Sequence, residues 1–207
     1  MSATAPPPTR PPQRGGGRDR ALLLVAAMVA LMWATEIVDA AGAHLDDDGI
    51  RPRDVDGLLG ILFAPFLHGG FGHLFGNTIP FLVLGAVIAL GGLVRVVAVT
   101  VIVGLVSGLG VWLLAPSNSV TIGASGIVFG YATYLLARGF YSRRGLHLGV
   151  GLLVLAVWGS TLLFGLVPTP GVSWQAHLFG AVGGVLAARV LDRRDRAEDG
   201  RRVALPT

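Results

Sequence analysis

Residues 96–115 read VVAVTVIVGLVSGLGVWLLA, twenty uncharged residues between Arg95 and Pro116. A helix of this length is about 30 Å long at about 1.5 Å per residue, which matches the hydrocarbon core of a bilayer. An uninterrupted apolar run of this kind is typical of a transmembrane helix. The stretch therefore predicts that the chain is embedded in a membrane.

The rest of the chain repeats this pattern. It has 207 residues, of which 53% are hydrophobic and 14% are charged, whereas soluble domains average about a quarter charged. The six expected spans cover residues 21–38, 72–94, 96–115, 125–137, 148–167 and 174–191. The expected fold is all-α, with a six-helix membrane domain over residues 21–191, a disordered Pro-, Gly- and Arg-rich tail (1–20) and a charged tail (192–207).

The basic residues, all of them arginine, indicate how the spans are oriented. Apart from Arg51 and Arg53 in the connector 39–65, they lie in the N-terminal tail, at Arg95, in the loop 138–144, and at the end of the sixth span and in the C-terminal tail. With six spans these segments share one side, and cytoplasmic loops carry the excess of Arg, so both termini should be cytoplasmic. The acidic connector 39–65 and the uncharged loops 116–124 and 165–173 then face outside. This topology accounts for the net charge of +4 without nucleic acid as a partner, and we expect a multi-pass protein of a bacterial plasma membrane.

Five hydrogen-bonding side chains break the apolar pattern near the outer ends of three spans: His68, His73, Asn77, Ser125 and His177. Polar groups at membrane depth are costly, so they are functional candidates by default. The thirteen residues from Ser125 to Ala137 make about 20 Å of helix, which places Ser125 roughly 10 Å below the outer boundary if Arg138 marks the inner one. A polar helix start at that depth implies a water-filled cavity open to the outside.

Two tracks of small residues predict that the fourth and sixth spans touch. They are Gly126-x-x-x-Gly130 and Ala176-x-x-x-Gly180-x-x-x-Gly184, and such faces allow helices to approach closely. Their outer ends carry Ser125 and His177, and a serine beside a histidine is the minimum for a nucleophile with its general base. The Ser125 amide, at a helix N-terminus, could bind an oxyanion. His73 and Asn77, on one helix face, could donate to the same oxygen.

Structural explanations compete with this interpretation for each residue taken alone. Ser107 is expected to be structural, and for Ser125 alone the two explanations weigh equally. His68 and His73 could be interfacial, or could form a metal site with Asn77. Their spacing is not a standard zinc pattern, and the chain has no cysteine to complete one. We therefore expect no metal and no cofactor.

Two acids, Glu36 and Asp39, close the first span and are candidates for a third catalytic member. Solvated acids at a helix end explain them better. The combination of a serine, two histidines and an asparagine on one leaflet is more specific than any of these residues alone.

Three segments resemble motifs of the rhomboid family of intramembrane serine proteases. They are HGGFGHLFGN (68–77), GASG (123–126) and AHLFGAVGG (176–184), which occur in the family's order within residues 60–190. The resemblance implies a six-span fold in which Ser125 is the nucleophile and His177 its base. It also implies an oxyanion hole of His73, Asn77 and the Ser125 amide, supporting roles for His68, Gly123, Gly126 and Phe129, and a cover over the site formed by residues 165–173.

Three positions depart from the family's pattern. Leu59-Gly60 stands where a Trp-Arg pair is common in the first outer connector, and the acidic residue common after the second span is missing. Phe129 stands where a tyrosine often supports the catalytic histidine, so the ring is kept and its hydroxyl is lost. None of these departures removes a catalytic group.

The leading hypothesis is an endopeptidase that cleaves single-span membrane proteins in or near their transmembrane segment through a Ser125–His177 dyad and an acyl-enzyme. Its partners would be these substrates and the lipid bilayer, while the sequence leaves the oligomeric state open. The alternative is a catalytically silent protein of the same fold that binds or escorts such partners. The lack of H-E-x-x-H and of an in-span Asp pair disfavours metallo- and aspartyl proteases, and the lack of internal repeats disfavours a transporter.

Overall fold

The computed structural model describes residues 16–142 and 144–204, and most of these are helical. The long helices are α1 (Gly16–Val38), α3 (Phe71–Ala89), α4 (Leu93–Leu114), α5 (Ser125–Ser142), α6 (Gly145–Phe164) and α7 (Trp174–Ala204). Short helical turns fill the connector between α1 and α3: η1 (Asp39–Ala43), η2 (Leu45–Asp48), η3 (Asp56–Leu58), α2 (Gly60–Phe63) and η4 (Ala64–Phe66). The described residues contain no β-strand beyond two isolated bridges, so the predicted all-α class is confirmed.

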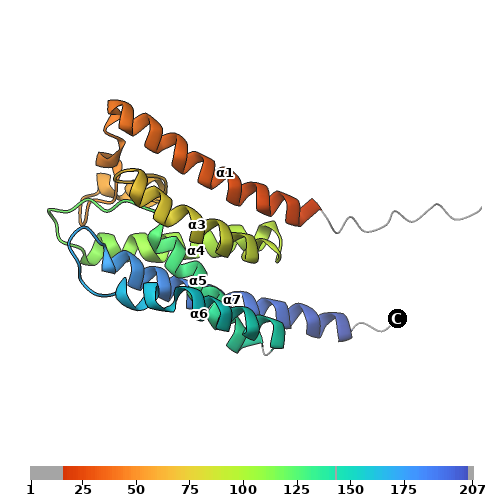
Figure 1. Ribbon diagram of the computed structural model, residues 1–207. Coiled ribbons are helices and arrows are strands. Elements are labelled where there is room, and N and C mark those ends of the chain that lie inside the picture. The colour runs from red at the N-terminus through yellow and green to blue at the C-terminus, as the bar shows by residue number, and fades with distance from the viewer. Residues whose placement is uncertain (1–15, 143, 205–207) are drawn as a thin grey trace, which may run out of the picture.

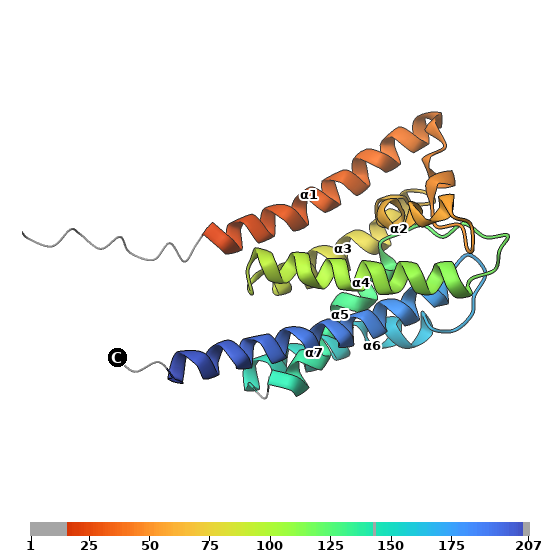
Figure 2. The same cartoon turned by 180° about the vertical axis from the view of Figure 1, so that it is seen from behind.

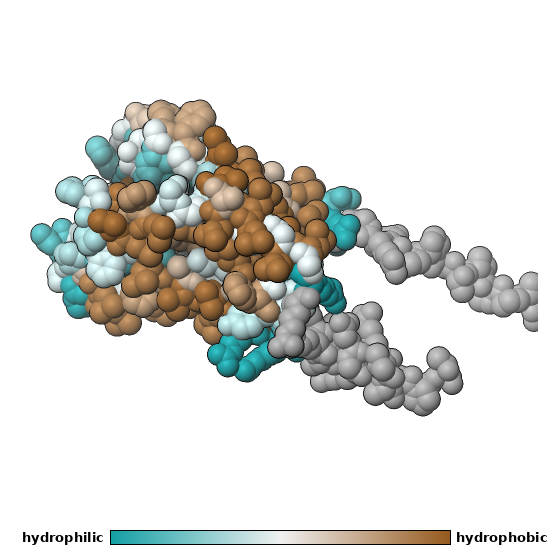
Figure 3. Space-filling view, turned by 60° about the horizontal axis from the view of Figure 1, so that its bottom comes forward, coloured by the Kyte–Doolittle hydropathy of each residue, from teal (hydrophilic) through white to brown (hydrophobic). Residues whose placement is uncertain are grey.

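Four of the described helical segments are long and apolar enough to cross a membrane: Gly17–Ala43, α3, α4 and α6. Hydrophobic side chains cover the middle of the face seen in Figure 3, and hydrophilic ones gather toward its ends. The chain is therefore a multi-pass membrane protein. α5 and α7 fall outside this group because their sequences hold more polar and small residues. Six spans stay a prediction.

α5 and α7 pack face to face along their small-residue tracks. An added Cβ on Gly180 would overlap the carbonyl oxygen of Gly126, and one on Gly184 would overlap that of Gly130. Only glycine permits backbones to come this close. The predicted contact between these two helices is therefore confirmed.

The other helices flank this pair (Figures 1 and 2). α4 packs on α7, where Ser107 Oγ donates to the carbonyl oxygen of Ala176 at 2.9 Å. Ser107 thus has the structural role expected of it. α6 packs on α5, and α1 lies at the periphery beside α3. The start of α1 and the end of α7 lie at the same end of the bundle (Figure 2), opposite the connector.

Several helix ends differ from those predicted. α1 already begins at Gly16, inside the predicted tail 1–20, of which residues 1–15 lie outside the described residues. α4 begins before Arg95, whose Nη1 donates to the hydroxyl of Tyr134 at 2.9 Å. α5 continues past Arg138 to Ser142, and α7 runs on through charged sequence. Arginine can extend its apolar stem toward a polar surface, so its charge does not mark the end of a helix.

Arg53 attaches the connector to the C-terminal end of α4. The Arg53 guanidinium donates to the carbonyl oxygens of Leu113 and Ala115, at 3.0 Å and 2.8 Å. Carbonyls at a helix C-terminus lack intrahelical partners, so Arg53 satisfies acceptors that would otherwise be open. Gly60 has a separate role, because an added Cβ there would overlap the backbone of Gly49. An arginine at position 60 would require these two backbone segments to move apart.

Candidate active site

Ser125 and His177 meet where α5 and α7 begin. Ser125 is the first residue of α5, and His177 lies in the first turn of α7. The Nε2 atom of His177 is 2.9 Å from Ser125 Oγ. The pair forms because the glycine tracks hold the two helices together immediately behind it. This is the geometry in which a serine hydroxyl can pass its proton to an imidazole.

The imidazole of His177 is buried and held on two sides. Its Nδ1 atom lies 2.7 Å from the carbonyl oxygen of Gly165, just past the end of α6. A carbonyl oxygen can only accept, so Nδ1 carries the hydrogen and Nε2 presents its lone pair to Ser125. The ring of Phe129 stacks on the imidazole, with centroids 4.0 Å apart and planes 3° apart. Both the tautomer and the orientation of the ring are therefore determined.

Gly123 brings His73 beside the start of α5. It has φ of +108°, a conformation that L side chains rarely adopt. Its N–H donates to the carbonyl oxygen of Ala64 at 2.8 Å, which fixes the turn that precedes Ser125. An added Cβ on Gly123 would lie 2.7 Å from Cε1 and 2.8 Å from Nε2 of the His73 ring. A glycine is therefore needed for the imidazole to lie this close to the turn.

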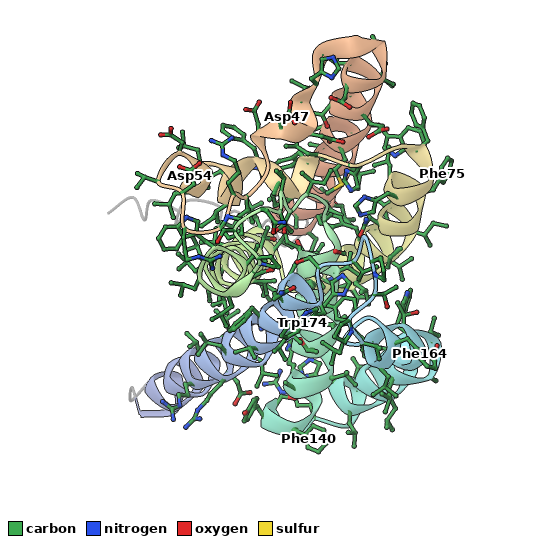
Figure 4. All side chains as sticks on the ribbon, turned by 90° about the vertical axis from the view of Figure 1, so that its left-hand side faces the viewer. Asp47, Asp54, Phe75, Phe140, Phe164 and Trp174 are labelled. Atoms are coloured by element: carbon green, nitrogen blue, oxygen red, sulfur yellow. The ribbon has the colours of Figure 1, made fainter. Side chains whose placement is uncertain are left out.

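A cavity of about 900 Å³ lies at the end of the bundle that carries the connector. Its lining includes Gly72, His73, Gly76 and Asn77 of α3, residues from the loop 115–122, Ser125, the loop 168–173, and Trp174, Gln175 and His177 of α7. Figure 4 views this end directly, with Trp174 near the middle of the picture and the connector residues Asp47 and Asp54 above it and to its left. The structure thus brings together the serine, the asparagine and two of the histidines that the sequence singled out.

Asn77 already makes one hydrogen bond within its own helix. Its Nδ2 donates to the carbonyl oxygen of His73 at 3.1 Å. A side-chain amide has two N–H donors, so one remains for another acceptor. The side chain is buried and borders the cavity.

His68 lies behind His73 and outside the cavity lining. The two rings meet edge to face, with centroids 5.0 Å apart and planes 65° apart. Burial, with a smaller effect from His73, lowers the pKa of His68 to about 4. A neutral His68 therefore packs against His73 and limits the positions that the latter can take. Gly126 lies outside the cavity lining and acts through helix packing, because an added Cβ there would overlap Ser107 Oγ of α4 and lie 3.1 Å from the Ala176 carbonyl oxygen of α7.

The acceptor for His177 Nδ1 is a backbone carbonyl. It is neither of the two acids, Glu36 and Asp39, that the sequence offered as candidates for a third catalytic member. Glu36 lies near the C-terminal end of α1, and Asp39 follows in the connector. Every residue has a carbonyl group, so the sequence held no signal for Gly165. Across residues 16–142 and 144–204, no group of three or more His, Cys, Asp or Glu residues is arranged to hold a metal ion.

The chain is similar to several bacterial proteins. An uncharacterized protein of Mycobacterium tuberculosis is 45% identical over 182 residues, which are 83% of this chain and 75% of that protein. An uncharacterized protein of Mycobacterium leprae is 42% identical over 182 residues, 83% of this chain and 72% of that protein. A Bacillus subtilis protein named "Putative rhomboid protease YdcA" is 27% identical over 167 residues, 78% of this chain and 83% of that protein.

The family model described as "Rhomboid domain" matches residues 56–194. The match covers more than half of the chain and includes every residue of the cavity lining. The chain therefore belongs to the rhomboid family.

Proposed function

We propose that this chain is an intramembrane serine endopeptidase that cleaves single-span membrane proteins in or near their transmembrane segment. One observation carries the proposal: His177 Nε2 lies 2.9 Å from Ser125 Oγ, and both residues border the cavity. A general base must be within hydrogen-bond reach of the proton that it removes. Family membership supports the same function.

The reaction follows from these positions. Ser125 Oγ attacks the carbonyl carbon of the scissile peptide, and its proton moves to His177 Nε2. The tetrahedral intermediate then collapses, the C–N bond breaks, and the leaving amine takes the proton from the imidazolium. Water attacks the resulting ester after giving a proton to His177, and the carboxylic acid product leaves as Ser125 regains its proton.

The negative charge of the tetrahedral intermediate requires donors at the start of α5. The first N–H groups of a helix have no intrahelical partner and carry partial positive charge, which makes the Ser125 amide one donor. The remaining amide hydrogen of Asn77 and the imidazole of His73 border the same cavity and supply the others.

Two further features concern how substrates reach the site. We assign both termini to the cytoplasm, which places the cavity on the outer side, in agreement with the arginine distribution. A reporter fused to residue 207 should be active only if it is a cytoplasmic reporter.

α3 begins and α6 ends at the end of the bundle that holds the cavity, and the two helices make little direct contact with each other. Phe75 of α3 and Phe164 of α6 point outward on the same side (Figure 4), which favours entry of a substrate helix between them.

The proposal is tested with a serine-directed fluorophosphonate probe and a model single-span substrate in detergent. Wild-type protein should be labelled and should cleave, while Ser125→Ala and His177→Ala should do neither. Ser160→Ala is the matched control, because Ser160 lies exposed on α6 away from the cavity lining. Wild-type protein that binds the substrate but is neither labelled nor active would instead identify a silent binding or escort protein.

A further inference from the structure

We infer that the backbone carbonyl of Gly165 is the positioning group of His177, so that the alignment of the base depends on where the outer end of α6 lies. The inference rests on the proposed function and names a group that acts through His177. In many serine hydrolases a carboxylate fills this position, by holding Nδ1–H and stabilising the imidazolium that forms. Here the acceptor at Nδ1 is the carbonyl oxygen, at 2.7 Å.

The position of this carbonyl suits the task electrostatically. Gly165 caps α6, and its N–H completes the helix by donating to the Thr161 carbonyl at 2.9 Å. Carbonyls at a helix C-terminus carry the negative end of the helix dipole, equivalent to about half an elementary charge. The imidazole of His177 therefore faces partial negative charge when it takes up the serine proton.

Glycine is the residue that this contact requires. An added Cβ at position 165 would overlap Cζ of Phe129 and would lie 3.1 Å from Nδ1 of His177. The glycine backbone, the phenyl ring and the imidazole therefore pack as one unit. The departure from tyrosine at position 129 fits this packing, because Cζ is the atom that would carry the missing hydroxyl.

Few buried side chains attach the C-terminal end of α6 to the rest of the bundle. Its buried residues are Gly151 and Val154, both in the first half of the helix, and its packing is mainly against α5. The second half is exposed or half-buried, and Phe164 points away from the bundle (Figure 4). Trp158 and Leu162 pack partly against the core, and the hydrogen bond from His177 is a further attachment of this end of α6. A polypeptide that pushes the end of α6 outward would also remove the acceptor from His177.

The test compares Gly165→Ala with Gly149→Ala. Both replace a glycine of α6 or its cap, but an added Cβ at position 149 meets nothing within 4 Å. For Gly165→Ala we expect kcat to fall about 100-fold, the loss typical of a misplacement of about 1 Å, with KM unchanged. Gly149→Ala should keep wild-type kcat and KM. A Gly165→Ala protein with wild-type kcat would overturn the inference.

A second measurement does not depend on activity. ¹⁵N NMR of histidine-labelled wild-type protein distinguishes the two tautomers, and the His177 signal is identified by its loss in His177→Gln. We expect the Nδ1–H tautomer in wild type and in Gly149→Ala, and a loss of this preference in Gly165→Ala. The Nε2–H tautomer in wild type would refute the inference. Failure of the proposed function is separate, since it would appear as wild-type protein that neither cleaves nor reacts with the fluorophosphonate probe.

Discussion

The ring of Phe129 lies flat on the imidazole of His177, with centroids 4.0 Å apart and planes 3° apart. The two side chains come from different helices, and the stack restricts rotation of the imidazole about its own bonds. A serine hydroxyl can transfer its proton only along a short and nearly linear path. In the proposed mechanism the phenyl ring therefore helps to align His177 without taking part in proton transfer.

Replacing Phe129 with Leu should lower kcat about tenfold or more and leave KM unchanged, because the volume is nearly kept while the flat face is lost. Phe140→Leu is the matched control, since Phe140 lies on the same helix and is 77% exposed. Steady-state cleavage of the model substrate measures both constants. Equal losses in the two variants would show that the stack has no special role.

Asn77→Ala should lower kcat by about 10² to 10³ and change KM little, because an oxyanion donor acts mainly in the transition state. Ile79→Ala is the control, because Ile79 lies on the same helix, is exposed and does not line the cavity. If KM rises strongly while kcat is unchanged, Asn77 binds the substrate and does not stabilise the intermediate.

Gly180→Ala should lower the apparent melting temperature, because the new methyl group would overlap the carbonyl oxygen of Gly126. Overpacking of this kind costs about 1–3 kcal/mol. Gly104→Ala, at a position of α4 where an added Cβ meets nothing within 4 Å, should be neutral or slightly stabilising. Thermal unfolding in detergent compares the two variants. A Gly180→Ala protein as stable as wild type would mean that the helices can separate at low cost.

The sequence indicated the members of the site better than the way they are held. Ser125 and His177 stood out because polar groups inside apolar spans are costly, and that argument depends on composition alone. The small-residue tracks predicted which helices meet. The hydrogen bond between His177 and the Gly165 carbonyl and those of Arg53 with the end of α4 could not be predicted in this way, because both depend on contacts between distant segments. The helix ends were also misplaced, since α5 continues through Arg138.

The stability of the protein should depend on pH through Asp46, which lies in the connector between α1 and α3. Burial, together with the nearby charges of Asp39 and Glu36, raises the pKa of Asp46 from its ordinary 3.8 to about 6. Between these values the folded protein keeps a proton that the unfolded chain has lost, so stability falls as pH rises through this window and stays lower above it. Asp46→Asn should therefore melt like wild type at pH 3.5 and at a higher temperature at pH 7.5.

Asp48→Asn, an exposed carboxylate of the same turn, controls for the general effect of removing a charge. The difference between the two variants should grow with pH and level off above about pH 6. A difference that is constant from pH 3.5 to 7.5 would contradict the assignment to Asp46.

The enclosed position of Ser125 also predicts which substrates are cut. A peptide bond inside an intact helix is hydrogen-bonded and shielded, so its carbonyl carbon cannot reach Ser125 in the cavity. The substrate must unwind locally, and helix-breaking residues lower that cost by about 1 kcal/mol for Gly and about 3 kcal/mol for Pro relative to Ala. We therefore expect fast cleavage of single-span substrates that carry a Gly or Pro shortly after the scissile bond. In a matched pair of substrates, replacing that Gly and Pro with Leu should lower kcat/KM by about 10-fold to 1000-fold, following the same helix propensities.

A third substrate with the same replacements at the opposite end of its span controls for hydrophobicity and should be cut like the parent. Equal rates for all three substrates would mean that local unwinding does not limit the proposed cleavage.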